Sequence, residues 1–284
     1  MRKLWTAMVG ALAISVAVAG IAIAANTYEV PKELVGVSPN AKGSLKKPVP
    51  ARLQFGFRVN DTEGMRPFVV ERYFIAAEGL QTFPETRPTC TYAQATDPLI
   101  SDPKDLSRAC RRAIVGRGTI HNEAGAPNDR SQKITCDVKI TLINISTGDP
   151  RYPETVKQIK KRGGMAIRID QYVTDQGADD PARCPPIDLH EALAAPFYDV
   201  KVDGVSTAEL RFNVPETLKH PSGLDNSVRE VASTVNKLKG KAKVRGKERT
   251  VGFYSAVGKK GKTRTTRVTF IDESGAKFTQ TQKE

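Results

Sequence analysis

The stretch that decides the fold is K-I-T-C-D-V-K-I-T-L, residues 133–142. Apolar side chains occupy every second position of this stretch, and polar side chains occupy the positions between them. Successive side chains of a β-strand point to opposite faces, so this alternation predicts a strand with one buried face and one solvated face. The residues predicted to share the buried face are Ile134, Cys136, Val138, Ile140 and Leu142.

Similar alternation recurs in residues 53–59, 165–169 and 208–214. A tight hairpin is predicted where Asp203-Gly204 separates residues 197–202 from residues 205–214, because both turn positions of such a hairpin need a positive φ. Strands of this kind, repeated along the chain, are typical of an antiparallel β fold.

Helices are scarce in the predicted fold. One amphipathic helix is predicted over residues 224–239, with Asp225 or Asn226 as its N-cap and Gly240 beyond its end. Its apolar stripe consists of Val228, Val231, Val235 and Leu238. Shorter helices are expected at residues 153–162 and 188–195.

Many short strands, one good helix and 18 prolines predict a mainly β chain. The expected architecture is a single antiparallel β-sandwich-like domain over residues 51–284, with the helix at 224–239 and a basic C-terminal hairpin region at 241–271.

The first 25 residues have the character of a signal peptide. Arg2 and Lys3 precede an apolar stretch that ends in small residues, which predicts cleavage after Ala24 or Ala25. The alternative is a retained N-terminal membrane anchor, because residues 4–25 are long enough to span a bilayer as a helix. We therefore expect a secreted or cell-surface protein, in which residues 26–50 form an extended tether.

Positive charge is concentrated in one segment. Residues 237–267 hold 12 of the 44 Lys and Arg residues but only one acidic residue, Glu248. Two further basic residues belong to the predicted signal peptide, so 30 basic and 30 acidic residues remain elsewhere. The mature chain is thus neutral apart from this basic segment.

The basic segment predicts binding to a polyanion. If residues 241–249 form one extended strand, the basic residues at every second position share a face, and a second hairpin (250–257 with 263–271) presents further lysines at its tip. The expected partner is an anionic cell-envelope polymer or an acidic lipid surface. Lysines on an edge strand also prevent edge-to-edge association without any ligand, and this alternative stays open. The predicted contact residues are Lys241, Lys243, Arg245, Lys247, Arg249, Lys259, Lys260 and Lys262.

Four cysteines follow the predicted signal peptide, where oxidation to disulfides is expected. Three pairings are open. We predict Cys90–Cys110, because both residues lie in one irregular proline-rich loop, together with Cys136–Cys184. A zinc site is the competing interpretation, but the cysteines lack the close spacing that zinc sites use.

No catalytic motif is complete. The residues His190-Glu191 begin a zinc-peptidase pattern that needs a second histidine at position 194, where this chain has Ala. No G-x-S-x-G sequence occurs, and we predict neither a metal nor another cofactor.

Several phrases resemble an uncharacterised family of exported β-rich proteins from high-GC Gram-positive bacteria. They are GLQTFPETRPTC (79–90), IVGRG (114–118), RFNVPETLKHPSGLDNSVREVASTV (211–235) and FYSAVGKKGKTRTTRVTF (253–270). The resemblance covers most of the mature chain and implies export and a single domain. The family has no assigned activity, so no functional residue follows from it.

These observations favour a non-enzymatic secreted or cell-envelope binding protein. The first alternative is a secreted hydrolase whose site is assembled from distant residues, such as a pair of carboxylates across a cleft. The second alternative is nucleic-acid binding, which export and the lack of a recognised module disfavour.

Overall fold

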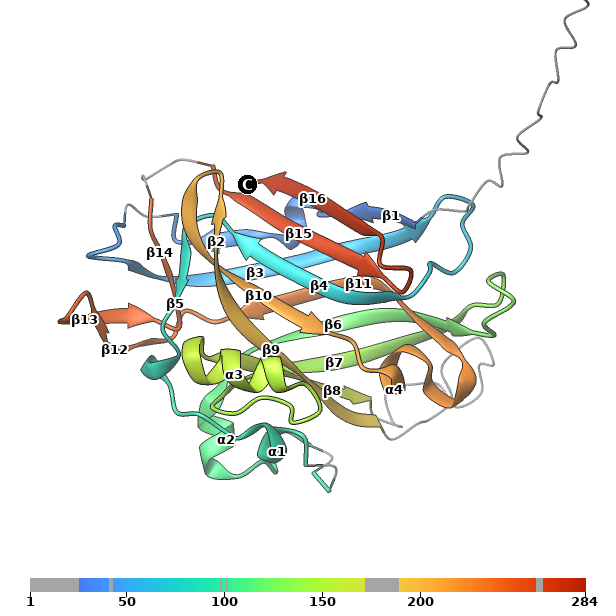
Figure 1. Ribbon diagram of the computed structural model, residues 1–284, viewed down its shortest axis with the longest axis horizontal. Helices are drawn as coiled ribbons and strands as arrows, with labels where there is room; N and C mark the ends of the chain where they lie inside the picture. Colours follow the sequence, from blue (N-terminus) through green and yellow to red (C-terminus); the bar gives the residue numbers. More distant parts are fainter. Residues whose placement is uncertain (1–25, 41–42, 98, 101, 172–188, 259–262) are drawn as a thin grey trace, which may run out of the picture.

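A computed structural model describes residues 26–40, 43–97, 99–100, 102–171, 189–258 and 263–284 (Figure 1). The predicted signal peptide, residues 1–25, lies outside the described residues. None of the described helices has the length and apolar character needed to cross a lipid bilayer.

The predicted strand at residues 133–142 is confirmed as part of β7 (Ile134–Ile145). Its alternate residues Cys136, Val138 and Ile140 are buried, whereas Asp137 and Lys139 between them are exposed. β7 pairs antiparallel with β6 (Ile114–Gly125) and with β8 (Gly164–Gln171). The quoted stretch therefore lies at the centre of the sheet.

The described strands form one large antiparallel sheet and one separate hairpin. Apart from β8, β7 and β6, the main path of the sheet contains β16 (Lys277–Lys283), β15 (Thr265–Asp272), β4 (Val70–Ala77), β10 (Val205–Asn213), β9 (Leu189–Val202), β11 (Asp225–Val235), β3 (Val49–Asp61), β14 (Tyr254–Ala256) and β5 (Leu80–Thr82). The order along the sheet is β16-β15-β4-β10-β9-β8-β7-β6-β11-β3-β14-β5. The prediction of a mainly β, antiparallel domain is confirmed.

The sheet curls so that distant strands face each other (Figure 1). Six strands separate β3 from β4 in the sheet order, yet the ring of Phe57 on β3 stacks on that of Tyr73 on β4 with 5.0 Å between centroids. Phe270 on β15 meets both rings edge-on. This aromatic cluster joins the two halves of the sheet and closes part of its interior.

A layer of short helices covers the outer face of β7, β8 and β9 (Figure 1). It contains α1 (Tyr92–Ala95), α2 (Arg108–Ala113) and α3 (Pro153–Arg162), the last of which confirms the helix expected at 153–162. Small residues on the strands, Ala166, Ala192 and Ala194, let this layer approach closely. The disulfide Cys90–Cys110 lies inside the layer and confirms that predicted bridge. The second predicted bridge includes Cys184, which lies outside the described residues.

The prediction of a helix at 224–239 is wrong, because residues 225–235 form strand β11. The pairing of β11 with β6 shifts register between Val228 and Glu230, which marks a bulge. The extra residue lets Val228 and Val231 face the same interior despite a spacing of three, which imitates a helical stripe. β-Branched residues in this segment also favour a strand.

The short helix predicted at residues 188–195 is not formed, because 189–195 belong to strand β9. The hairpin that follows is confirmed: β9 pairs with β10 around Asp203 and Gly204, whose φ values are 47° and 79°.

The tether predicted at 26–50 is also wrong, because this segment belongs to the domain. Strands β1 (Asn26–Glu29) and β2 (Gly36–Ser38) both pair with β3, and η1 (Lys32–Leu34) connects them. Tyr28 and Val37 are buried in the main core. Two strands of three or four residues are too short for a periodic pattern, and their stability depends on the neighbouring strand β3.

The second predicted hairpin, 250–257 with 263–271, is not formed. β15 pairs with β4 and β16, while β14 pairs with β3 and β5. The basic hairpin is instead β12 (Lys239–Val244) with β13 (Lys247–Gly252), joined by Arg245 and Gly246 at φ values of 49° and 79°. Both turn residues adopt the left-handed conformation that such two-residue hairpins need.

We expect replacement of both Cys90 and Cys110 by Ser to lower the free energy of unfolding by about 3 kcal/mol, because the bridge closes a loop of 20 residues. Urea unfolding of the oxidised protein and the double variant measures the difference. Peptide mapping without reductant should recover the 90–110 link. Equal stability of the two proteins would show that the outer layer does not depend on the bridge.

Candidate ligand cavity

The interior of the curled sheet contains a cavity of about 260 Å³. None of the described residues that line it is charged. The wall is built mainly from alternate residues of β6, β7, β8 and β11, together with aromatic residues of β3, β4 and β10. The lining residues from β6, β7 and β8 are Ile120, Asn122, Ala124, Ile134, Cys136, Val138, Ile140, Ile167 and Ile169.

Several inward-facing apolar side chains of the cavity are only partly buried. Ile120, Phe212 and Val228 pack against the core but keep intermediate exposure. They face the interior because of the alternation of their strands, yet no side chain from the described part of the chain fills the space in front of them. Protein interiors are normally packed to the density of organic crystals, so this accessible apolar space is unusual.

The connection between β10 and β11 contributes to one end of the cavity wall. This connection contains α4 (Glu216–Lys219) and η4 (Pro221–Gly223). Leu218, Pro221 and Leu224 line the cavity, and so does the exposed residue Ser222. We call residues 215–224 the cap, because this segment contributes to the cavity wall at this end.

A chain of charged side chains holds the cap on its outer side. His220 Nε2 lies 2.8 Å from Glu273 Oε1, and His220 Nδ1 lies 3.0 Å from Asp225 Oδ1. The fully buried Arg66 then donates to Asp225 Oδ2 at 3.2 Å. Glu273 follows β15, and Arg66 precedes β4. These charged side chains therefore connect the cap to two other loops.

Both ring nitrogens of His220 face carboxylates, which favours the doubly protonated ring. Burial alone would lower the pKa of His220, but the hydrogen bonds and charges of Glu273 and Asp225 outweigh it and raise the pKa above its ordinary value. Although burial would raise the pKa of Glu273, the neighbouring Lys219 and His220 lower it.

Glu216, His220 and Glu273 place one ligand atom each within 4.8 Å of one another, which is the spacing of a metal site. However, Lys219 Nζ lies 3.0 Å from Glu216 and 2.7 Å from Glu273. The ammonium group therefore pairs with both carboxylates, and together with protonated His220 it balances their charge, so the cluster is an ion-pair network.

Two polar atoms beside the cavity lack a hydrogen-bond partner in the described part of the chain. These atoms are Tyr73 Oη and Asn122 Oδ1. Residue Tyr73 is 2% exposed to solvent, and residue Asn122 is 6% exposed. Burial raises the pKa of Tyr73, so the phenol stays protonated. An unpaired buried hydroxyl destabilises a fold by about 1–3 kcal/mol.

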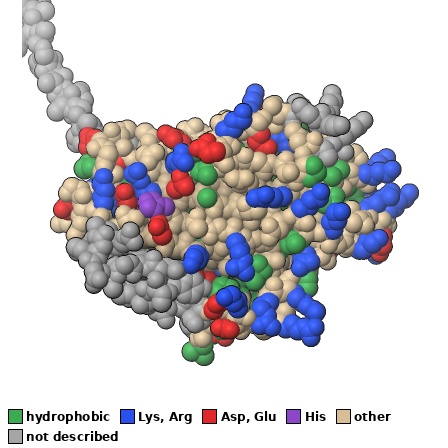
Figure 2. Space-filling view, turned by 180° about the vertical axis from the view of Figure 1, so that it is seen from behind, with side chains coloured by type: hydrophobic (Ala, Val, Ile, Leu, Met, Phe, Trp, Pro, Cys, Tyr) green, Lys and Arg blue, Asp and Glu red, His purple; other side chains and the backbone are tan. Residues whose placement is uncertain are grey.

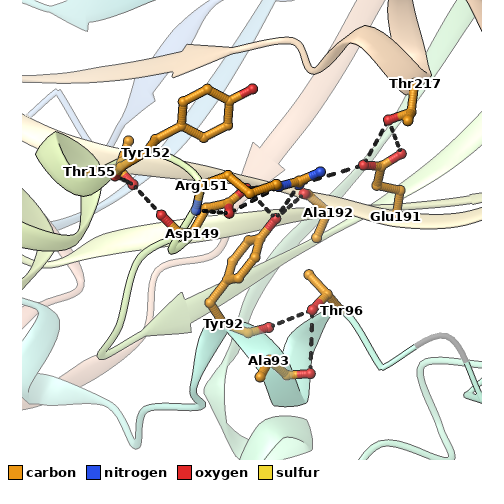
Figure 3. A network of polar contacts seen from close by, with 10 residues as sticks. All are labelled: Tyr92, Ala93, Thr96, Asp149, Arg151, Tyr152, Thr155, Glu191, Ala192 and Thr217. Carbon is orange, nitrogen blue, oxygen red and sulfur yellow. Dashed lines mark hydrogen bonds and ion pairs between the residues drawn. The ribbon is translucent and has the colours of Figure 1, made fainter.

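A second polar network lies under α1, on the outer side of the sheet (Figure 3). Arg151 donates from Nη2 to Asp149 at 2.8 Å and approaches Glu191 at 3.7 Å. Tyr92 Oη lies 2.7 Å from the carbonyl oxygen of Ala192 and 3.0 Å from Asp149 Oδ2. Burial would raise the pKa of Asp149, but hydrogen bonds from Arg151 and its neighbours lower it. The network joins α1, the loop before α3 and strand β9.

This network bears on the alternative of a hydrolase. A carboxylate pair acting on a sugar needs one member with a raised pKa that can donate a proton. Here the pKa of Asp149 is lowered, and Arg151 lies between Asp149 and Glu191. One guanidinium forms ion pairs with both carboxylates, so the geometry of the network indicates a structural role.

The basic residues predicted to share one face are divided by the hairpin turn. Lys241 and Lys243 pair with Thr250 and Glu248, while Lys247 and Arg249 pair with Val244 and Ala242 on the opposite face. The prediction of a single face is therefore wrong, because the strand reverses at Arg245. Lys259, Lys260 and Lys262 lie outside the described residues.

The cavity was not predicted from the sequence, although its wall uses the alternation that predicted the strands. The alternation predicts that Val138 and Ile140 face inward. It does not predict whether another side chain fills the space in front of them. Partners for that space come from β3, β4 and β10, which lie far away in the chain.

We expect Tyr73→Phe to raise the free energy of unfolding by about 1 kcal/mol, because it removes an unpaired hydroxyl and keeps the ring stacked on Phe57 and Phe212. The matched control is Tyr92→Phe, which removes a paired hydroxyl and should lower stability by a similar amount. Chemical unfolding compares the three proteins. A loss of stability in Tyr73→Phe would mean that its hydroxyl has a partner.

We expect His220→Gln to destabilise the protein more at about pH 6 than at about pH 9. A raised pKa means that His220 stabilises the fold fully below its unfolded pKa of about 6.5, and that this contribution is lost as pH rises through the folded value. Thermal unfolding at both pH values measures the gap. A pH-independent gap for His220→Gln would contradict the role of its charge.

No known protein family, curated protein or solved structure matches this chain. The candidate function therefore depends on the geometry of the cavity and on the chemistry of its wall.

Proposed function

We propose that the protein is an exported, non-enzymatic binding protein that holds an apolar small molecule inside its curled sheet. The observation that carries this proposal is the uncharged cavity of about 260 Å³ with an exposed residue, Ser222, in its wall. Burial of apolar surface is the main driving force for binding in such a site.

The size of the cavity limits the ligand. An engineered apolar cavity of about 150 Å³ binds benzene, and sites for larger molecules begin at about 300 Å³. A cavity of about 260 Å³ lies between these values. We therefore favour a single acyl chain or a small ring system over a lipid with several chains.

Export is part of the proposal. It is supported by the signal-peptide character of residues 1–25 and by the disulfide Cys90–Cys110, which suits an oxidising compartment. The proposed location is the cell surface or the surrounding medium. An apolar molecule is poorly soluble there, and a protein that encloses it would keep it in aqueous solution.

A binding role without catalysis is supported by the chemistry of the wall. The described lining residues include no Asp, Glu, His, Lys or Arg that could transfer a proton. The described lining residues with a hydroxyl or amide group are Tyr73, Asn122, Ser222 and Asn226, which suit positioning of a ligand.

We expect the purified protein to bind a dansyl-labelled fatty acid with a rise in dansyl fluorescence, since the dye reports transfer to an apolar environment. The variants Val138→Phe and Val228→Phe place larger side chains in the cavity and should weaken binding at least about 10-fold, which corresponds to about 1.4 kcal/mol. An unlabelled fatty acid should compete with the probe.

The matched control is Val156→Phe, the same substitution at a site on α3 that is 37% exposed. It should bind like the wild type, and thermal unfolding should verify that all variants are folded. Absence of probe binding to the wild type, or equal binding by all four proteins, would reject the proposed cavity function.

A further inference from the structure

A second concave site lies between the β12–β13 hairpin and the end of α3. Its volume is about 570 Å³, and we call it the hairpin–α3 cleft. Side chains from segments far apart in sequence meet there. The lining residues are Leu45, Pro48, Gln81, Thr82, Phe83, Pro84, Glu85, Lys161, Arg162, Gly163, Lys243, Val244 and Arg245.

Among the described residues, four cations and one carboxylate line this cleft. Lys161 and Arg162 come from the last turn of α3, where the helix dipole favours positive charge. Lys243 and Arg245 come from the hairpin, and Glu85 is the opposing charge. Figure 2 shows Lys and Arg side chains gathered at the hairpin end of the molecule.

Most of these cations form no ion pair with the described residues. Arg162 forms an ion pair with Asp199, and Lys241 on the hairpin pairs with Glu248 at 3.5 Å. Within the described part of the chain, Lys161, Lys243 and Arg245 form no ion pair. Unpaired cations around a concave, low-dielectric surface concentrate the electrostatic field toward an incoming anion.

The hairpin is held in place rather than projecting freely. Ala242, Val244 and Val251 are buried and pack against Phe83, which precedes η2 (Pro84–Thr86). Gly240 lies directly against the backbone of Thr86, where a side chain would collide. The cationic side chains are therefore presented by a fixed backbone, which reduces the entropy lost when a ligand binds.

We infer that the hairpin–α3 cleft binds a segment of a flexible anionic polymer through repeated phosphate or carboxylate groups. A polymer is favoured over a membrane because Lys161 and Arg162 line a recess, which a thin chain enters more readily than a flat bilayer. The inference does not depend on the cavity function, since the two sites share no lining residue.

The test uses fluorescently labelled long-chain polyphosphate as the probe, with the change in anisotropy measured between about 50 and 300 mM salt. The cleft variant combines Lys161→Gln, Lys243→Gln and Arg245→Asn. Asn preserves the turn, because Asn-Gly is a favoured pair for this hairpin geometry. The matched control removes three exposed charges that do not line the cleft, through Lys201→Gln, Lys277→Gln and Lys283→Gln.

We expect the cleft variant to bind at least about 10-fold more weakly than the control at low salt. A plot of log affinity against log salt concentration has a negative slope. For the cleft variant, the magnitude of this slope should be smaller than for the wild type by about 2, because three charges are lost. Thermal unfolding should verify that both variants are folded. Equal affinity of the two folded variants for polyphosphate would overturn the inference. Binding of anionic phosphatidylglycerol vesicles without binding of polyphosphate would also overturn it, in favour of a membrane contact.

Discussion

The structure depends on one constraint: a sheet with an apolar inner face must bury that face against itself. The short helices of the outer layer cover the other face of β7–β9 and cannot fill the interior. Curling brings β3 against β4, and the stacked rings of Phe57 and Tyr73 hold the two halves together. Where the aromatic rings end, the facing strands stay apart, and the cavity occupies the space that remains.

The positions of the charged side chains at the cap and at the β12–β13 hairpin follow from where the apolar side chains of these segments are buried. At the cap, apolar residues such as Leu218 face the cavity, so the charged residues of that segment face outward and pair with neighbouring loops through His220. At the hairpin, the β12–β13 strands bury Ala242 and Val244 against Phe83, so Lys241 and Lys243 remain in solvent. The two candidate sites thus have opposite chemistry, an apolar interior and a cationic recess, within one fold.

Local interactions explain what could be predicted from the sequence. The central strand, the Asp203-Gly204 hairpin, the helix at 153–162 and the Cys90–Cys110 bridge each depend on residues close together in the chain. Where a prediction was wrong, a distant partner overrode the local pattern. The bulge beside Val228 imitated a helical stripe, and strands β1 and β2 exist because β3 lies beside them.

The sequence by itself determined the β class, one disulfide and the concentration of charge near residue 240, because alternation, loop closure and net charge are properties of neighbouring residues. Only the tertiary structure decided the curl of the sheet, the cavity and the meeting of α3 with the hairpin. These features depend on which strands face each other across the interior. The periodicity of one strand specifies its inward face but not the distance to the side chains opposite it.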